Sequence, residues 1–444
     1  MKSRGLLVAA VVLVALTGTL YWSNHHKSAS SADSFPESSP KILTLQQAEV
    51  TALSIRKKSG DRVMLVRNDA GQWQITAPEA LAADPDAVSS MLSTLSSLNS
   101  DRLVEDKASN LDQYGLAQPS IDVEITKKDK RVQQLLIGDD TPTGNGAYAA
   151  VAGDPRVFTM ASYNKNSFAK SVNDLRDKRL LTFDSDRVSS IELTAKKRTI
   201  TFGRSKDEWQ IVRPQPFRAD RFQVEELLRT LHDAKMDLSG SDDDKKATAA
   251  FGSGTPFASA KVTDVSGTQE LQVRKNKDEY YAKSSAVAGT YKISSGTGAG
   301  LDKDLNAFQN KKLFDFGFSD PDKVEVHDGP KSYFLTHSGS DWWSNGAKMD
   351  PGGVSALIDK IRDLSASKFA ETGFGAAVLD LSVTSDSGKH VEKVLLAKNG
   401  DNYLAKRENE PALYELNAAA VAELQKSAAD LKPAAVPAPP PSKK

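Results

Sequence analysis

Three regions of the chain share one spacing of apolar and polar residues. In each region apolar residues recur three or four positions apart, which is the period of one face of an α-helix. An aspartate precedes each apolar face, at Asp84, Asp220 and Asp350, where it can accept a hydrogen bond from a backbone N–H of the first turn. We therefore predict three amphipathic helices capped by these aspartates. Their apolar faces consist of Val88, Met91, Leu92, Leu95 and Leu98; Val224, Leu227, Leu228 and Leu231; and Val354, Leu357, Ile358, Ile361 and Leu364.

Segments that alternate between apolar and polar residues surround each predicted helix and indicate β-strands. A strand-like segment and a tryptophan (Trp73, Trp209 or Trp342) precede each helix. Two further segments and a pair of aromatic residues, spaced as in a β-hairpin, follow it. The segments are 50–55, 121–125 and 133–137 in the first region, 188–193, 258–262 and 270–273 in the second, and 324–327, 379–383 and 393–396 in the third.

The pattern therefore occurs three times, and each copy is roughly 130 residues long, the size of a domain. The predicted fold class is α+β: an N-terminal transmembrane helix followed by three tandem repeats of an antiparallel sheet plus a helix. The expected domains are a cytoplasmic tip and membrane anchor (1–22), a flexible spacer (23–44), three repeats (45–184, 185–317 and 318–432) and a disordered Pro- and Ala-rich tail (433–444).

The N-terminus carries a long apolar run. Residues 5–22 contain no charged side chain and follow Lys2 and Arg4; as a helix they extend about 27 Å, close to the thickness of the hydrocarbon core of a bilayer. Because basic residues precede the run, the positive-inside rule places the remaining chain in the periplasm or outside. We predict a single-pass protein of the inner (cytoplasmic) membrane. A signal peptide cleaved near Ser28-Ala29-Ser30 is the alternative.

Charge and composition narrow the function classes. The chain has 444 residues, with 58 Lys and Arg against 58 Asp and Glu, so its formal net charge is zero. Nucleic-acid-binding proteins usually carry an excess of basic residues, and we therefore expect no nucleic-acid partner. Cysteine is absent, which excludes disulfides, zinc–thiolate sites, iron–sulfur clusters, thiol nucleophiles and the acylated cysteine of a lipoprotein.

No motif for catalysis, metal binding or cofactor binding stands out, so we expect no catalytic, cofactor-binding or metal-binding residues and no cofactor. His327 and His337 flank a predicted hairpin and can approach each other, but no third ligand is evident. Residues 296–300 (Gly-Thr-Gly-Ala-Gly) resemble a phosphate-binding loop, yet we interpret them as a loop before a helix. The acidic run 242–244 lacks the spacing of a calcium loop. The basic cluster 176–179 is interpreted as a surface helix between repeats, with a partner-binding patch as the alternative.

The recurring tryptophans allow two interpretations. A tryptophan can form an aromatic platform for sugar or lipid, or it can fill the core where a helix crosses a sheet. Each of the three precedes a cap aspartate by a similar interval, which favours the core.

A set of motifs resembles a known bacterial family. These are Trp73-Gln74-Ile75, Ala83-Asp84, Tyr114-Gly115-Leu116 with Pro119, Ile137-Gly138, and Asp174-Leu175-Arg176-Asp177-Lys178. Their order and spacing are similar to domain of unknown function 4340, most clearly over residues 45–185. The resemblance implies a membrane-anchored envelope protein that occurs alongside ABC-transporter components of the gliding-motility type. It implies no catalytic residues.

We therefore expect a non-enzymatic, membrane-anchored extracytoplasmic scaffold or accessory protein. Its expected partners are the membrane, through residues 5–22, and the subunits of an ABC-type transport complex of the cell envelope. The alternative is a periplasmic module that binds lipid, glycan or peptide. An enzyme that uses carboxylates is a third hypothesis, and it requires two acidic groups that converge in a cleft.

Overall fold

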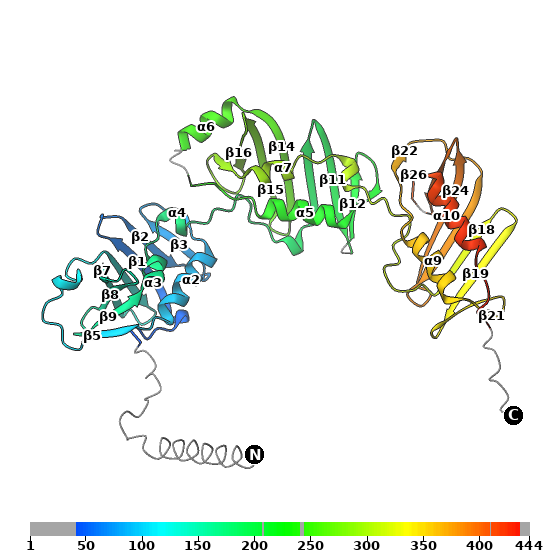
Figure 1. Ribbon diagram of the computed structural model, residues 1–444. Helices are drawn as coiled ribbons and strands as arrows, with labels where there is room; N and C mark the ends of the chain where they lie inside the picture. Colours follow the sequence, from blue (N-terminus) through cyan, green and yellow to red (C-terminus); the bar gives the residue numbers. More distant parts are fainter. Residues whose placement is uncertain (1–40, 207, 240–243, 409, 436–444) are drawn as a thin grey trace, which may run out of the picture. The chain divides into compact units, whose positions relative to one another are not determined.

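The computed structural model describes residues 41–206, 208–239, 244–408 and 410–435 (Figure 1). The predicted membrane span 5–22, the predicted spacer up to residue 40 and residues 436–444 of the predicted tail lie outside these ranges. Within them, no helix has the length and apolar composition needed to cross a bilayer.

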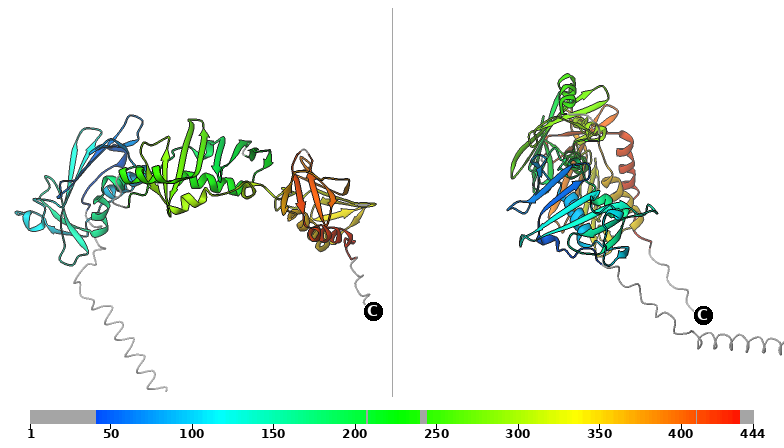
Figure 2. Two further views of the ribbon diagram at one scale, coloured as in Figure 1. Left: turned by 90° about the horizontal axis from the view of Figure 1, so that it is seen from above. Right: turned by 90° about the vertical axis from the view of Figure 1, so that its left-hand side faces the viewer.

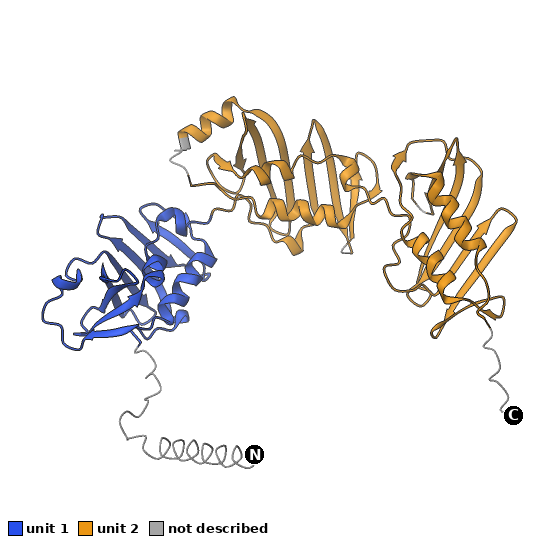
Figure 3. Cartoon of the chain, in the orientation of Figure 1, with its two compact units in different colours: residues 1–177 blue, residues 178–444 orange. Residues whose placement is uncertain are grey.

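The chain divides into two compact units after Asp177 (Figure 3). Unit 1 contains one antiparallel sheet, and unit 2 contains two. Each sheet has a long amphipathic helix, α2, α5 or α9, along one face (Figures 1 and 2). The predicted α+β architecture of three repeated sheet units is thereby confirmed.

The sheet of the first repeat has nine strands in the order β4-β3-β2-β1-β6-β7-β8-β9-β5. The strands are β1 (Val50–Lys57), β2 (Arg62–Arg67), β3 (Trp73–Ala77), β4 (Leu81–Ala82), β5 (Arg102–Glu105), β6 (Ile121–Lys127), β7 (Val132–Asp140), β8 (Gly146–Val151) and β9 (Val157–Ala161). The helices are α2 (Pro85–Ser96), α3 (Ser162–Phe168) and α4 (Val172–Leu175), with short 3-10 turns at Gln47–Glu49 and Asp112–Tyr114.

The second sheet has the order β13-β12-β11-β10-β14-β15-β16-β17, the same arrangement without the last edge strand. Its strands are β10 (Ser190–Ala195), β11 (Arg198–Ser205), β12 (Glu208–Arg213), β13 (Phe217–Arg218), β14 (Thr255–Asp264), β15 (Gly267–Asn276), β16 (Glu279–Ser284) and β17 (Tyr291–Ile293). The helices are α5 (Arg221–His232), α6 (Asp244–Ser253), α7 (Ser295–Gly300) and α8 (Leu305–Phe308), with a 3-10 turn at Ser185–Arg187.

The third sheet restores the nine-strand order, β21-β20-β19-β18-β23-β24-β25-β26-β22. Its strands are β18 (Lys323–Asp328), β19 (Lys331–Ser338), β20 (Asp341–Ser344), β21 (Ala347–Lys348), β22 (Lys368–Ala370), β23 (Ala377–Ser385), β24 (His390–Asn399), β25 (Asn402–Arg407) and β26 (Leu413–Leu416). A single long helix, α10 (Ala418–Ala429), takes the place of the two short helices of the earlier repeats and packs beside α9 (Pro351–Arg362).

The three predicted caps are confirmed. Asp84 accepts hydrogen bonds from the N–H groups of Asp86 and Ala87 at 2.9 and 3.1 Å. Asp220 and Asp350 accept one bond each from the first turn of α5 and α9. The predicted apolar stripes of all three helices lie in the core.

Removal of one cap should loosen its helix measurably. For Asp84→Ala we expect the free energy of unfolding to fall by about 1 kcal/mol, because two backbone donors lose their acceptor. Hydrogen exchange of the first-turn amides of α2 should accelerate about fivefold, because 1 kcal/mol corresponds to about a fivefold change in the equilibrium between the closed and the locally open helix. Asp84→Asn, which keeps the acceptor oxygen, is the control. Equal protection in wild type and Asp84→Ala would contradict the capping role.

Each repeat begins with an apolar segment that lies largely outside the predicted bounds of that repeat, in the predicted spacer or at the end of the preceding repeat. These lead-in segments are residues 41–45, 178–183 and 311–316. Each pairs with the chain that follows the long helix of its own repeat, through the bridges Lys41 to Asn99, Arg179 to Lys235 and Lys312 to Ser365. Their apolar side chains are buried: Ile42, Leu43 and Leu45; Leu180, Leu181 and Phe183; and Leu313, Phe314 and Phe316. The expected boundaries at 45, 185 and 318 fall at the end of these segments or just after it.

The predicted surface helix at 176–179 is wrong. Helix α4 ends at Leu175, and the next residues are extended: Arg176 pairs with Ala83 and Arg179 pairs with Lys235. The physical reason is that this stretch forms the bridges that end the first repeat and begin the second. A helix here would leave those backbone partners unpaired.

Candidate functional site

The two histidines that flank the predicted hairpin lie apart. His327 pairs with Ser332 near the turn of the β18–β19 hairpin, whereas His337 lies at the other end of that hairpin and stacks on Trp342. Across the described parts of the chain, no group of three or more His, Asp or Glu side chains could hold a metal ion.

The glycine-rich residues 296–300 belong to helix α7 itself rather than to a loop before it. The ring of Tyr280 packs against this helix so closely that a Cβ at Gly298 would clash with it. The glycine therefore allows close packing of helix against sheet. Of the acidic run 242–244, residues 242 and 243 lie outside the described residues.

The tryptophans that mark the repeats are core residues in unit 2. Trp209 and Trp342 are each 5% exposed. Trp73 is half-buried and packs against the core of the first repeat. The core interpretation is confirmed for two of the three, and the neighbouring Trp343 faces the other side of its strand.

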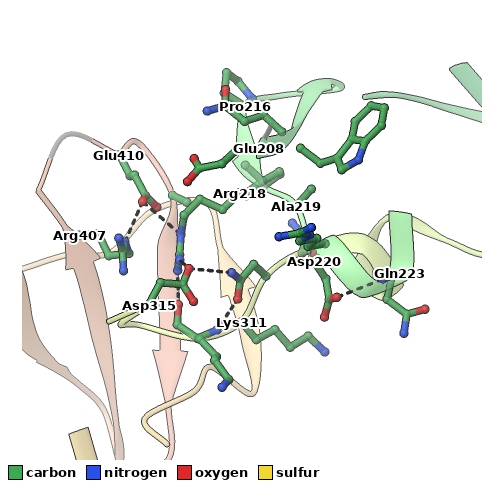
Figure 4. Close-up of a pocket in the computed structure, with 18 of the residues that line it drawn as sticks. Glu208, Pro216, Arg218, Ala219, Asp220, Gln223, Lys311, Asp315, Arg407 and Glu410 are labelled. Carbon is green, nitrogen blue, oxygen red and sulfur yellow. Dashed lines mark hydrogen bonds and ion pairs between the residues drawn. The ribbon is translucent and has the colours of Figure 1, made fainter. Parts of the chain in front are cut away.

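A cleft of about 1140 Å³ lies within unit 2, between the second and third repeats (Figure 4). Strands β12 and β13 and the start of α5 form one wall. The lead-in segment of the third repeat and the connection from β25 to β26 form the other. The lining side chains that matter here are Glu208, Trp209, Phe217, Arg218, Asp220, Phe222, Lys311, Lys312, Asp315, Arg407 and Glu410.

Arg218 connects the two repeats across the cleft. Its Nη1 pairs with the Asp315 carboxylate and its Nη2 donates to the Lys312 carbonyl. Its Nε lies 3.2 Å from Glu410 Oε1, an ion pair without the alignment of a hydrogen bond. Burial disfavours the charged guanidinium, but Tyr414, Glu410 and Asp315 outweigh this effect and raise the pKa of Arg218. The ring of Phe217, beside Arg218, packs edge-on against Phe369 of the third repeat at 5.1 Å.

A second arginine completes the cluster beneath the cleft. Arg407 donates from Nε to Glu410 at 2.7 Å, from Nη2 to Glu392 at 3.0 Å, and from Nη1 to the Leu313 carbonyl. Glu392 also accepts from the N–H of Asp315 at 3.0 Å, and its side chain is only 2% exposed. We call Arg218, Asp315, Glu392, Arg407 and Glu410 the ion cluster. Every charge in it has an opposite charge within reach, as burial requires.

Tyr414 caps the ion cluster. Its hydroxyl donates to Glu410 Oε2 at 2.8 Å, and the ring is fully buried. Burial, together with the Glu410 carboxylate, raises the pKa of Tyr414 from its ordinary value of 10.0 to about 12, although the positive charge of Arg218 opposes this shift.

This shift predicts an alkaline loss of stability. The folded chain holds the phenol proton more tightly than the unfolded chain, so the stabilisation is complete below pH 10 and is lost as pH rises from 10 to 12. We expect the loss to approach 2–3 kcal/mol, about 1.4 kcal/mol for each pH unit. Urea unfolding at pH 9 and pH 11.5 should show it in wild type and not in Tyr414→Phe. An equal fall in the free energy of unfolding between pH 9 and pH 11.5 in the two proteins would contradict this role of Tyr414.

The rim of the cleft differs from its base, because several side chains have no part in the ion cluster. The Phe222 ring is 79% exposed. Lys311 and Lys312 line the cleft, and no carboxylate partner is found for either among the described residues. Among the described carboxylates that line the cleft, Glu208 has neither an ion pair nor a capping role, whereas Asp315 and Glu410 pair with arginines and Asp220 caps α5.

The sequence did not predict this cleft, because its charged residues come from distant parts of the chain. Arg218 and Glu410 are far apart in sequence, and neither belongs to a motif. One signal was available: Arg218 directly precedes the Ala219-Asp220 pair at the start of a predicted helix, where the other repeats have Ala82 and Lys348. A change between copies at a fixed position marks a role that only one copy has.

The comparisons with known proteins agree with the repeat structure. Residues 73–210 and 209–381 each match the family model described as Domain of unknown function (DUF4340). The two matches begin at Trp73 and Trp209, the same position in successive repeats. The curated proteins contain no match to the chain.

Two solved structures that match are both from Pseudomonas aeruginosa. One is a DNA polymerase sliding clamp with ligand, and the other is the DNA polymerase III subunit beta. Each is 10% identical to this chain and covers 85% of it, with 93% and 94% of their own lengths aligned and TM-scores of 0.15 and 0.14. These values support no conclusion about fold or function. The family matches together span 73–381, more than two thirds of the chain, and the chain belongs to the DUF4340 family.

Proposed function

We propose that the chain is a non-enzymatic scaffold or accessory protein of the cell envelope. Residues 5–22 would anchor it in the cytoplasmic membrane with the repeats in the periplasm or outside. Its partner would be an ABC-type transport complex, which docks at the cleft of unit 2. The anchor is supported by the apolar run and the preceding Lys2 and Arg4. The transporter is supported by the resemblance of the chain to a family whose members often occur alongside such complexes.

The observation that carries the proposal is the contrast between the base and the rim of the cleft. At the base, the ion cluster neutralises its own charges and joins two repeats. At the rim, Phe222 exposes an aromatic ring to the same cleft that Lys311 and Lys312 line. An exposed aromatic residue close to unpaired charges is typical of the surfaces where proteins bind one another.

Docking accounts for the cleft better than catalysis does. General acid–base chemistry usually needs two titratable groups that can reach the same substrate. Of the four carboxylates that line this cleft, Asp220, Asp315 and Glu410 already have structural partners. Of the described lining carboxylates this leaves Glu208, whose side chain is exposed.

The test uses the tagged full-length protein, crosslinked in its native membranes and purified. Wild type should recover permease or ATPase subunits of an ABC-type transporter. Phe222→Asp should reduce that recovery about tenfold or more, because a buried aromatic anchor contributes about 2 kcal/mol to an interface. Val265→Asp is the matched control, since Val265 is also exposed but does not line the cleft.

Two results would contradict the proposal. One is the recovery of no transporter subunit by wild type under conditions that retain other membrane complexes. The other is undiminished recovery by Phe222→Asp. The alternative function, a module that binds lipid, glycan or peptide, is favoured by an observation on a different surface, the outer face of the third sheet.

A further inference from the structure

The outer face of the third sheet carries exposed aromatic rings. Side chains alternate between the two faces of a strand, so Trp342 and Leu335 point into the core while Trp343 and Phe334 point outward. Trp343 is 39% exposed and Phe334 is 42% exposed. They lie on the neighbouring strands β20 and β19, where Trp343 pairs with Thr336. Phe334 lies two positions along β19 from Thr336, so it is a diagonal neighbour of Trp343. The Cα atoms of such neighbours are about 7–8 Å apart.

This pair of rings is specific to the third repeat. The buried residues Leu65, Phe202 and Leu335 occupy equivalent positions, because they pair with Leu53, Ile191 and Val324 in the three sheets. The residue equivalent to Phe334 is therefore Met64 in the first repeat and Thr201 in the second. The residue equivalent to Trp343 is Gln74 or Gln210, which follows the core tryptophan. The fold does not require an aromatic residue at either position.

Polar groups of both signs surround the rings. Glu325 pairs directly with Phe334 across β18 and β19, and the ring of His327 lies 5.3 Å from the Phe334 ring. Lys393 Nζ lies 3.1 Å from Asp380 Oδ2. Asp380 Oδ1 is buried and accepts no hydrogen bond from any described group. An acceptor that is buried without a donor is uncommon in folded proteins, but because Oδ1 is buried a ligand at the surface does not reach it. The Asp380 side chain as a whole is 28% exposed, so the ligand contact assigned to Asp380 is at its exposed part.

We propose that the outer face of the third sheet binds a glycan built of pyranose sugars. The apolar C–H face of a sugar ring would pack on Trp343 and Phe334. Its hydroxyl groups would bond with Glu325, His327 and Asp380, charged or polar groups that make strong hydrogen bonds. The two residues lie on neighbouring strands of one face, so a single oligosaccharide can contact both.

Other ligand classes fit this face less well. A lipid surface requires a continuous apolar patch or a cluster of cations, and here Glu325 and Lys393 interrupt the apolar residues. A nucleic acid requires an excess of cations along its backbone, whereas Lys393 is already paired with Asp380. The combination of flat aromatic rings with acceptors and donors is what a neutral sugar needs.

The test is titration calorimetry of the full-length protein in nanodiscs with two probes, the hexamers of β-1,4-linked glucose and of β-1,4-linked N-acetylglucosamine. Saturable binding of at least one hexamer is expected. Trp343→Gln and Phe334→Thr install the residues of the second repeat, so both should fold, and each should weaken binding about tenfold or more. Tyr163→Ala, at an exposed aromatic residue of unit 1 outside this face and outside the cleft, is the control and should bind normally.

Three outcomes would overturn the glycan site. One is the absence of heat with both hexamers, and another is binding that both variants leave unchanged. The third is a change in oligomeric state of Trp343→Gln by sedimentation, without any sugar binding by wild type, which would make the face a contact between copies. Transporter capture by Trp343→Gln should remain at the wild-type level, so this site and the docking cleft can fail independently.

Discussion

Replacing Glu392 by alanine is expected to lower the free energy of unfolding of unit 2 by about 3–5 kcal/mol. The carboxylate is 2% exposed and neutralises Arg407 while accepting from the N–H of Asp315. Its removal leaves a buried guanidinium with one carboxylate fewer and a backbone donor without an acceptor. Removing one partner of a buried ion pair lowers the free energy of unfolding by more than the intact pair raises it, because the remaining charge is buried without its partner.

Denaturant unfolding followed by tryptophan fluorescence would measure this loss, since Trp209 and Trp342 are buried in unit 2. A double-mutant cycle with Arg407→Met provides the control. The double variant should be more stable than the sum of the single losses predicts, because removal of both charges leaves neither unpaired. Additive losses, or a loss below about 1 kcal/mol for Glu392→Ala, would contradict this description of the ion cluster.

The second large effect is expected for Phe308→Ala, which should lower the free energy of unfolding by about 3–5 kcal/mol. Its side chain is fully buried, and its ring packs edge-on against Phe202 at 4.9 Å. Its carbonyl also accepts from the N–H of Asp220 at 2.7 Å, so the residue lies where the end of the second repeat meets the start of α5. Alanine would leave a cavity between the sheet and this junction.

Phe222→Ala is the matched control for that variant, because Phe222 is exposed and its truncation should change stability by less than about 0.5 kcal/mol. Phe308→Leu, which retains most of the volume, should fall between the two. Equal stabilities for Phe308→Ala and Phe222→Ala would show that the core of the second repeat does not depend on this ring.

Local sequence patterns predicted the parts of the fold that local physics determines. Helix caps and apolar stripes were readable because a helix places its cap and its core residues at fixed intervals. Strand segments were readable by alternation, although β23 and β24 extend several residues beyond the predicted 379–383 and 393–396. The family resemblance was also correct.

The lead-in segments were missed because their buried side chains span only a few residues, too few for a period to be recognised. The helix predicted at 176–179 failed because bridges to Ala83 and Lys235 determine its conformation. The ion cluster joins residues from both repeats of unit 2, and such pairs have no sequence signature. Trp343 was not identified as a candidate, because the face to which a strand residue points depends on its register.

The most direct test of the proposed function is site-specific photocrosslinking in living cells. A photoreactive amino acid would replace Phe222 in the tagged full-length chain, and in a second strain it would replace the exposed Val265 outside the cleft. The docking proposal predicts that a permease or ATPase subunit of an ABC-type transporter is captured from position 222 and not from position 265. Capture of the same subunit equally from both positions, or of no transporter subunit from position 222, would contradict it.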